Sequence, residues 1–230
     1  MTKTIAVAQS NYIPWKGYFD LINSVDEFIL YDDMQYTRRD WRNRNRIKSS
    51  KGLIWLTIPV QVKGKYFQKI NQTVVANHKW ANEHWTSIAH NYSKAKYFSE
   101  YGNKFEELYT GAQANLLSQI NYDFITAICR MLGIRTTVSW SMDYQLIGDK
   151  TERLVNLCKQ TRATTYLSGP AAKAYLDEEA FARRGIAVSY MDYSGYPEYD
   201  QLYPPFADRV SIVDLIFNEG SNATKYMKSF

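Results

Sequence analysis

The spacing of hydrophobic residues changes several times along the chain, and each change predicts an element. Two short apolar runs with β-branched residues, Thr4–Gln9 and Phe28–Tyr31, are typical of buried strands. Between them, the segment GYFDLINSV repeats its apolar positions at helical spacing. A strand, a helix and a second strand in this order predict a βαβ unit, in which the two strands lie parallel in one sheet.

The rest of the chain alternates in the same way around a helical middle. We expect a strand over Leu53–Val60, closed by Pro59, and helical patterns over residues 78–91, 103–117 and 120–131. The later elements are predicted to be the strand TTVSW, the helix TERLVNLCKQT with Thr151 as its N-cap, the strand TTYL, a helix start at AAKAYL and the strand GIAVSYMDY. This alternation predicts one α/β domain over residues 1–230, with a mostly parallel Rossmann-like sheet and a helical insertion over residues 77–132.

Composition adds limits on the class of protein. The chain is 45% hydrophobic and 22% charged, which is ordinary for a globular domain. Its first residues lack a secretory signal pattern, and no stretch reaches the roughly 18 apolar residues that a membrane span needs. We therefore expect a cytoplasmic protein without a membrane span. Cys129 and Cys158 both fall in apolar helical patterns, which predicts reduced core residues.

Positive charge is concentrated in one segment, residues 38–51. This segment sets one acid, Asp40, against the cations Arg38, Arg39, Arg42, Arg44, Arg46, Lys48 and Lys51. Such a cluster favours binding of an anion, which nucleic acid, a pyrophosphate or a phosphorylated lipid can each supply. A solvated basic loop that binds nothing is equally compatible with the charges alone.

The turn after the first strand, QSNYIPWKGY, is rich in rings. In open parallel sheets, ligands bind beyond the carboxyl ends of the strands, and the first βα turn is a common place for them. Gly17 allows a close backbone approach and Pro14 stiffens the loop. The residues expected to contact a base or a sugar here are Gln9, Tyr12, Trp15, Gly17 and Tyr18. The alternative is that these aromatic side chains cap the core.

The same turn can be compared with that of nucleotidyltransferases, where an H-x-G-H motif holds a nucleoside triphosphate. Trp15, Lys16, Gly17 and Tyr18 occupy the four positions here, so only the glycine matches. A relation to that fold is therefore an analogy at the level of the fold.

Three further groups carry candidate chemistry. Asp32 and Asp33 follow the second predicted strand, where a carboxylate can deprotonate an amine, bind a divalent ion or simply cap a loop. His90 is an alternative acid or base, or an ordinary surface histidine. In the later loop, Ser168, Gly169 and Lys173 precede and begin a helix and can hold an anionic group, although their spacing is not that of a P-loop.

No metal site is expected from the histidines. His78, His84 and His90 are spaced six residues apart, which turns each about 600° from the last on a helix and spreads them over three faces. The two cysteines also lack the spacing of a zinc ligand pair.

Long blocks of the sequence resemble the WbqC-like family. They are the opening QSNYIPWKGYFDLINSVDEFILYDDMQYTRRDWRNRNRIK, then WLTIPV, HWTSIAHNYSKAKYF, TERLVNLCKQTRATTYLSGPAAKAYLDEEAF and SIVDLIFNEG. One departure is Ser10–Asn11, where a proline is expected at the second place. The resemblance implies a role in bacterial surface-polysaccharide (O-antigen, lipopolysaccharide) biosynthesis. There the expected activity attaches an amino-acyl group such as glycine, or another acyl group, to the amine of a nucleotide-linked amino-deoxysugar.

These expectations combine into one hypothesis, an amide-forming acyl or aminoacyl transferase. Asp33 would be the general base, with Asp32 or His90 as alternatives, and Tyr12, Trp15 and Tyr18 would form the platform for base or sugar. The pyrophosphate would be held by Arg42, Arg44, Arg46 and Lys48, and the second substrate's anion by Ser168, Gly169 and Lys173. The donor stays open among an acyl thioester, an adenylate made with ATP and a charged tRNA. Two other classes stay open: a non-catalytic sugar-nucleotide binding protein, and a nucleic-acid (tRNA) binding module that uses residues 38–51.

Overall fold

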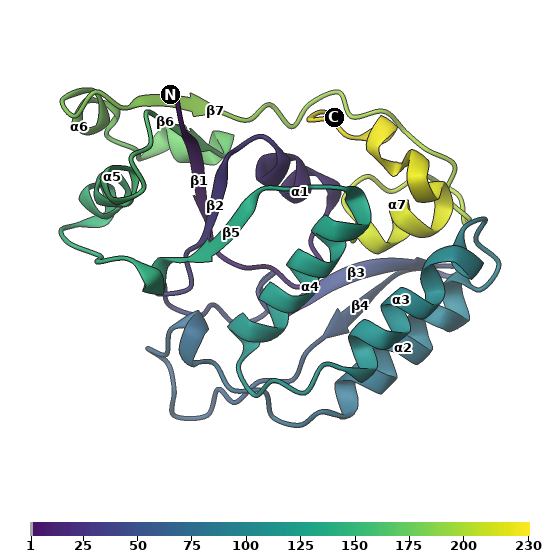
Figure 1. Ribbon diagram of the computed structural model, residues 1–230. Helices are drawn as coiled ribbons and strands as arrows, with labels where there is room; N and C mark the ends of the chain where they lie inside the picture. Colours follow the sequence, from purple (N-terminus) through teal and green to yellow (C-terminus); the bar gives the residue numbers. More distant parts are fainter. Residues whose placement is uncertain (1) are drawn as a thin grey trace.

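A five-stranded parallel sheet forms the centre of the computed structural model, which describes residues 2–230 (Figure 1). Its strand order is β5-β2-β1-β6-β7, and every neighbouring pair is parallel. The strands are β1 (Thr4–Ala8), β2 (Glu27–Leu30), β5 (Thr137–Trp140), β6 (Thr165–Ser168) and β7 (Ala187–Tyr190). With β1 in the middle and the chain extending the sheet first on one side and then on the other, this is the order of a Rossmann-like sheet. The predicted α/β fold class is confirmed.

Helices cover both faces of the sheet because successive strand residues point to opposite sides. Phe28 and Leu30 of β2 belong to the large core with the helices α1 and α4, whereas Ile29 between them packs with α5 and α6. These helices are α1 (Lys16–Asn23), α4 (Leu117–Leu132), α5 (Lys150–Gln160) and α6 (Glu178–Ala182). Cys129 of α4 and Cys158 of α5 are free and buried, as predicted.

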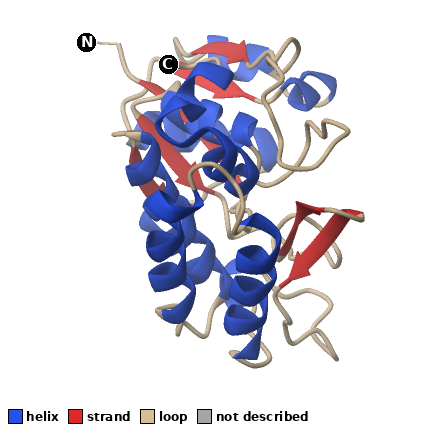
Figure 2. Ribbon diagram, turned by 90° about the vertical axis from the view of Figure 1, so that its right-hand side faces the viewer, coloured by secondary structure: helices blue, strands red, loops and turns tan. Residues whose placement is uncertain are grey.

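The basic segment begins with turns over residues 38–43 and continues as a strand of a hairpin outside the main sheet. β3 (Arg44–Ser49) pairs antiparallel with β4 (Gly52–Thr57), and Figure 2 shows this hairpin as a separate pair of strands. Asn45 and Ile47 of β3 point inward and are buried, while Arg44 and Arg46, which alternate with them, are partly exposed. The strand predicted at Leu53–Val60 is therefore present, and its partner is the segment that carries the charge.

The middle of the chain is helical. α2 (Lys79–Tyr92) and α3 (Phe98–Thr110) lie side by side and lead into α4 (Figures 1 and 2). The second predicted helix, over 103–117, was wrong by five residues or more at each end, because Leu116 pairs with Val74 in an isolated bridge instead of continuing α3. Within residues 2–230, none of the helices has the length and apolar character needed to cross a membrane.

Shorter elements complete the chain. Asp149, not Thr151, is the N-cap of α5, and its side chain accepts hydrogen bonds from the N–H groups of Thr151 and Glu152. The segment AAKAYL, predicted to start an α-helix, lies at the 3₁₀ turn Pro170–Ala174. The other 3₁₀ turns are η1 (Ile70–Gln72), η2 (Ser141–Asp143) and η4 (Gly220–Tyr226).

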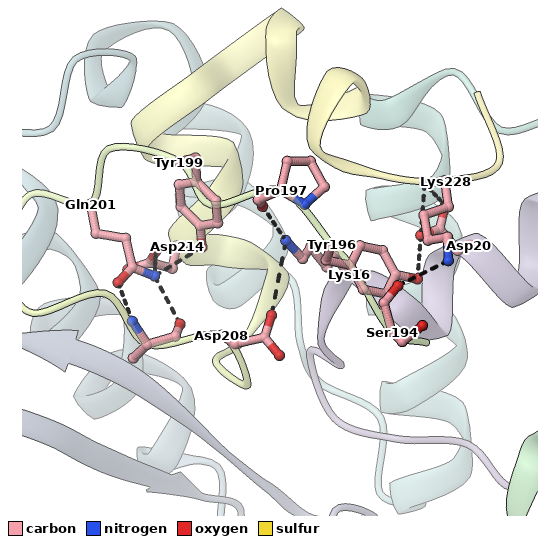
Figure 3. Close-up of polar contacts among 11 residues, drawn as sticks. Lys16, Asp20, Ser194, Tyr196, Pro197, Tyr199, Gln201, Asp208, Asp214 and Lys228 are labelled. Carbon is pink, nitrogen blue, oxygen red and sulfur yellow. Dashed lines mark hydrogen bonds and ion pairs between the residues drawn. The ribbon is translucent and has the colours of Figure 1, made fainter. Parts of the chain in front are cut away.

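A connecting segment, residues 191–211, joins β7 to the buried helix α7 (Ile212–Glu219) without regular secondary structure. Two fully buried carboxylates hold it in place (Figure 3). The hydroxyl of Tyr196 donates to Asp20 at 2.6 Å, and that of Tyr199 donates to Asp214 at 2.7 Å. The segment therefore runs along α1 in a fixed path despite its lack of helix or strand.

Candidate functional site

The backbone of the first βα turn is strained, and hydrogen bonds from neighbouring side chains hold it in this conformation. Ile13 has a φ of 35°, which is costly for a β-branched residue. The side-chain amide of Asn45 donates to the carbonyls of both Tyr12 and Ile13, at 3.1 and 2.9 Å. Arg42 also donates to the side chain of Asn11. Strain of this kind is often found at ligand sites, where surrounding contacts hold the backbone in place.

Two of the three rings expected to form a platform lie inside the core. Tyr12 is fully buried, and its hydroxyl is 2.9 Å from Nδ1 of His84 and 2.7 Å from the hydroxyl of Tyr109. Tyr18 is also buried and donates to the carbonyl of Gln9 at 3.0 Å. The helical period of α1 turns Tyr18 toward the sheet, so neither ring has a free face for a ligand.

Trp15 is the ring that faces outward. It lies over Gly17, where a Cβ atom would come within 2.4 Å of the indole. The glycine therefore makes room for Trp15 and not, as expected, for a ligand. The tryptophan pocket, about 260 Å³ in volume, is lined by Asn11, Pro14, Trp15, Trp41, Asn45, Tyr193 and Arg209.

A second cavity of about 300 Å³ adjoins it, and Trp41 lines both. Its lining residues are Arg39, Asp40, Trp41, Arg44, Arg46 and Trp55, which we call the arginine–tryptophan surface. The Arg44 guanidinium lies 4.1 Å from the centre of the Trp55 ring, and the rings of Trp41 and Trp55 are 5.5 Å apart. Both indoles are unusually open, with 39% of Trp41 and 44% of Trp55 exposed.

Of the other two cations of the predicted pyrophosphate site, Arg42 contacts Asn11 and Asp40 beside the two cavities, and Lys48 is turned away from them. Lys48 is 3% exposed, and its ammonium donates to Gln201 at 2.7 Å and to the carbonyls of Tyr203 and Pro205. Burial lowers the pKa of Lys48. Although Lys48 shares the strand face of Arg46, the connecting segment covers it, so its charge supports the fold and does not meet a ligand.

Asp32 is fully buried, and its hydrogen bonds connect the first βα turn to α4. Its carboxylate accepts from the N–H of Ser10 at 2.9 Å and from the hydroxyl of Ser118 at 2.5 Å. Asn121 continues this network by donating to the hydroxyl of Ser10 and to the carbonyl of Arg42. Burial raises the pKa of Asp32, and the hydrogen bonds from Ser118 and Ser10 oppose the rise. Asp32 is therefore a positioning residue, out of reach of a substrate amine.

The side chain of Asp33, the next residue, lines a different cavity beyond the ends of β2 and β5. This Asp33 pocket, about 450 Å³ in volume, is lined by Asp33, Lys69, Met142, Tyr144, Leu146 and Arg153. One Asp33 oxygen lies 3.2 Å from the Lys69 ammonium, and the other accepts from the hydroxyl of Ser141 at 2.8 Å. The carboxylate is 14% exposed, so it is fixed in position yet reachable.

With this geometry described, the comparison with known proteins identifies the family. The model described as the WbqC-like protein family matches residues 9–226. The chain belongs to the WbqC-like protein family. It is also similar to the uncharacterized protein Rv1507c of Mycobacterium tuberculosis (strain ATCC 25618 / H37Rv), with 52% identity over 226 residues that cover 98% of each chain. No solved structure matches this chain.

The remaining candidates in this WbqC-like protein lie outside both the tryptophan pocket and the Asp33 pocket. Gln9 follows β1, and Gly169 follows the neighbouring strand β6. The chain adds β2 and β5 on one side of β1 and then β6 and β7 on the other, so the strand order reverses between β1 and β6. Ser168 is buried at the end of β6, and the ammonium of Lys173 lies 4.9 Å from the ring of Tyr190. His90 is exposed on α2 and lines neither pocket.

Several pocket residues were missed by sequence reasoning. Trp55 carried a usable signal, since it shares a strand face with the partly exposed Arg44 and Arg46 once β3 and β4 are paired. Lys69 and Arg153 carried none, because they are 84 residues apart and only the fold brings them to Asp33.

Proposed function

We propose that this protein is a transferase that forms an amide on the amine of a nucleotide-linked amino sugar. The observation that carries the proposal is the Asp33 pocket, where one carboxylate lies with two cations at the carboxyl edge of a parallel sheet. Lys69 and Arg153 match the phosphates of a nucleotide-linked sugar, and Asp33 matches its ammonium group. The cavity is also large enough to enclose much of such a ligand.

Formation of the amide requires one proton acceptor. A sugar ammonium must lose a proton before its nitrogen attacks the acyl carbonyl, and Asp33 would take that proton. The new C–N bond then replaces the bond between the acyl carbon and its carrier, and the leaving group departs with a proton. Ser141 and Lys69 each contact one Asp33 oxygen, which keeps the orientation of the carboxylate fixed during the transfer.

The family supports the wider setting of this proposal. The resemblance to this family implies a role in surface-polysaccharide biosynthesis, and nucleotide-linked amino sugars are precursors of such polymers. A cytoplasmic location follows, because these precursors are made there. The relative from M. tuberculosis is uncharacterized and adds no activity.

A non-catalytic sugar-nucleotide binding protein is the second candidate. The ion pair between Asp33 and Lys69, at 3.2 Å, favours it, because the carboxylate already has a cationic partner. Under this alternative the pocket would bind its ligand without needing a base, and replacing the carboxylate by an amide would leave function intact.

The experiment compares wild type with Asp33→Asn on nucleotide-linked amino sugars and on the matching sugars that carry a hydroxyl group. Binding is measured by calorimetry, and turnover by mass spectrometry with thioester, ATP plus amino acid, and aminoacyl-tRNA donors. We expect wild type to prefer the amino sugar and Asp33→Asn to lose about 100-fold or more in turnover while still binding it. Equal binding of both sugars, with no product from any donor, would refute the transferase. Loss of binding in Asp33→Asn would make Asp33 a ligand contact only.

A further inference from the structure

The arginine–tryptophan surface takes no part in the Asp33 chemistry, yet it is built like a binding surface. We infer that it binds single-stranded nucleic acid, and that the acyl donor is therefore a charged tRNA whose single-stranded 3′ end lies on this surface. This inference rests on the proposed function for the identity of the donor. The binding itself rests only on Trp41, Trp55 and the arginines beside them.

The aromatic groups are arranged as stacking platforms. The ring centres of Trp41 and Trp55 are 5.5 Å apart, both side chains are more than a third exposed, and Trp15 lies beyond Trp41 in the tryptophan pocket. Stacking of Arg44 on Trp55 fixes the plane of its guanidinium. Proteins that bind single strands without strong sequence preference combine such rings with a cationic track.

The charges point to a polyanion. Four cations line the two adjoining cavities, Arg39, Arg44, Arg46 and Arg209, against one carboxylate, Asp40. Arg38, next to Arg39, is exposed as well. A nucleoside diphosphate has two phosphates and fits one cavity, whereas a strand has a phosphate at every nucleotide and can follow both cavities past Trp41. The extended row of cations and rings therefore fits a strand better.

The tryptophan pocket and the Asp33 pocket lie beside turns that follow two neighbouring strands, β1 and β2. Asn11 of the tryptophan pocket follows Ser10, whose N–H donates to Asp32, the neighbour of Asp33. Both pockets thus adjoin the turns that follow β1 and β2, at one edge of the sheet. A strand end that passes Trp55 and Trp41 and reaches Trp15 would bring its terminal group to the side of the molecule where Asp33 lies.

The test uses the whole protein and a fluorescein-labelled single-stranded RNA that ends in CCA, with binding followed by anisotropy. We expect the double variant Trp41→Ala/Trp55→Ala to weaken binding by about tenfold or more for each stacked base lost. The double variant Trp41→Phe/Trp55→Phe, which keeps an aromatic face at both positions, should restore most of it. Equal melting temperatures of the two variants show that the loss is not misfolding.

Salt dependence tests the arginines. Each phosphate contact to a single strand contributes about −0.7 to the slope of log affinity against log salt, so Arg44→Ala/Arg46→Ala should flatten the slope by about 1.4. The matched control is Arg183→Ala/Arg184→Ala, which removes the same charge from two exposed arginines at the end of α6. This control should keep both the affinity and the slope of wild type.

Three outcomes would overturn the binding of a nucleic-acid strand: no RNA binding, RNA binding that the tryptophan variants leave unchanged, or displacement of the RNA by a free nucleoside diphosphate at micromolar concentration. The last would make the surface a pocket for small nucleotides. Asp33→Asn separates the two proposals, since it should bind RNA like wild type while losing turnover. Product formed with a thioester and none with aminoacyl-tRNA would refute the tRNA donor and leave the transferase standing.

Discussion

Acidification is expected to destabilise the fold through His84. This side chain is 7% exposed, and burial lowers its pKa to about 4, against an ordinary value of 6.5. Because the pKa is lower in the folded state than in the unfolded state, the histidine contributes stability above pH 6.5 that is lost as the pH falls through 4. The gap of about 2.5 pKa units corresponds to roughly 3.4 kcal/mol in all, of which about 2.5 kcal/mol is lost between pH 7.5 and 4.5.

The assay is urea unfolding of wild type and His84→Phe at pH 7.5 and 4.5. Carboxylates also titrate in this range, so the quantity of interest is the difference between the two proteins in their loss of unfolding free energy. We expect His84→Phe to lose about 2.5 kcal/mol less than wild type on acidification. Tyr12→Phe is the matched control, because it removes the same hydrogen bond and keeps the buried imidazole. An equal loss in wild type and His84→Phe would refute the reasoning.

Three other substitutions test the packing and the site. Gly17→Ala places a Cβ atom 2.4 Å from the Trp15 ring and should cost about 1–3 kcal/mol in urea unfolding, and adding it to Trp15→Ala should cost much less. Lys48→Met removes the buried ammonium that donates to Gln201 and to the carbonyls of Tyr203 and Pro205, and should lower the unfolding free energy by about 1–3 kcal/mol; an unchanged value would contradict its structural role. Asp33→Asn breaks an ion pair with the half-exposed Lys69 and should change stability by less than about 1 kcal/mol, which calorimetric melting can check.

Most of the sheet could be predicted from the sequence because the patterns that indicate its strands are local. Short apolar runs and the helical spacing between them predicted the strands around α1 and α5 and most of the helical middle. The parallel pairing of β1 and β2 followed from the connection between them. The predicted bounds of α3 were wrong, since Leu116, in the last predicted turn, pairs with Val74 instead.

The candidate site was harder to predict because burial depends on packing between distant segments. Tyr12, Asp32 and Lys48 have side chains that suit a ligand, yet each is buried by residues far away in the sequence. Trp15 is partly exposed and lines a pocket, with its indole packed in the space that Gly17 leaves. The type of a residue indicates what it can bind, while the fold decides which groups it meets.

The burial of Asp20 also bears on how the chain is made. Its carboxylate accepts hydrogen bonds from Tyr196 and from Lys228 and Ser229, which are separated from it by 176 to 209 residues. On the ribosome, α1 is therefore synthesised long before the groups that donate hydrogen bonds to this carboxylate. A nascent chain that lacks these partners must keep this carboxylate hydrated, so the first helix can reach its final place only late in translation.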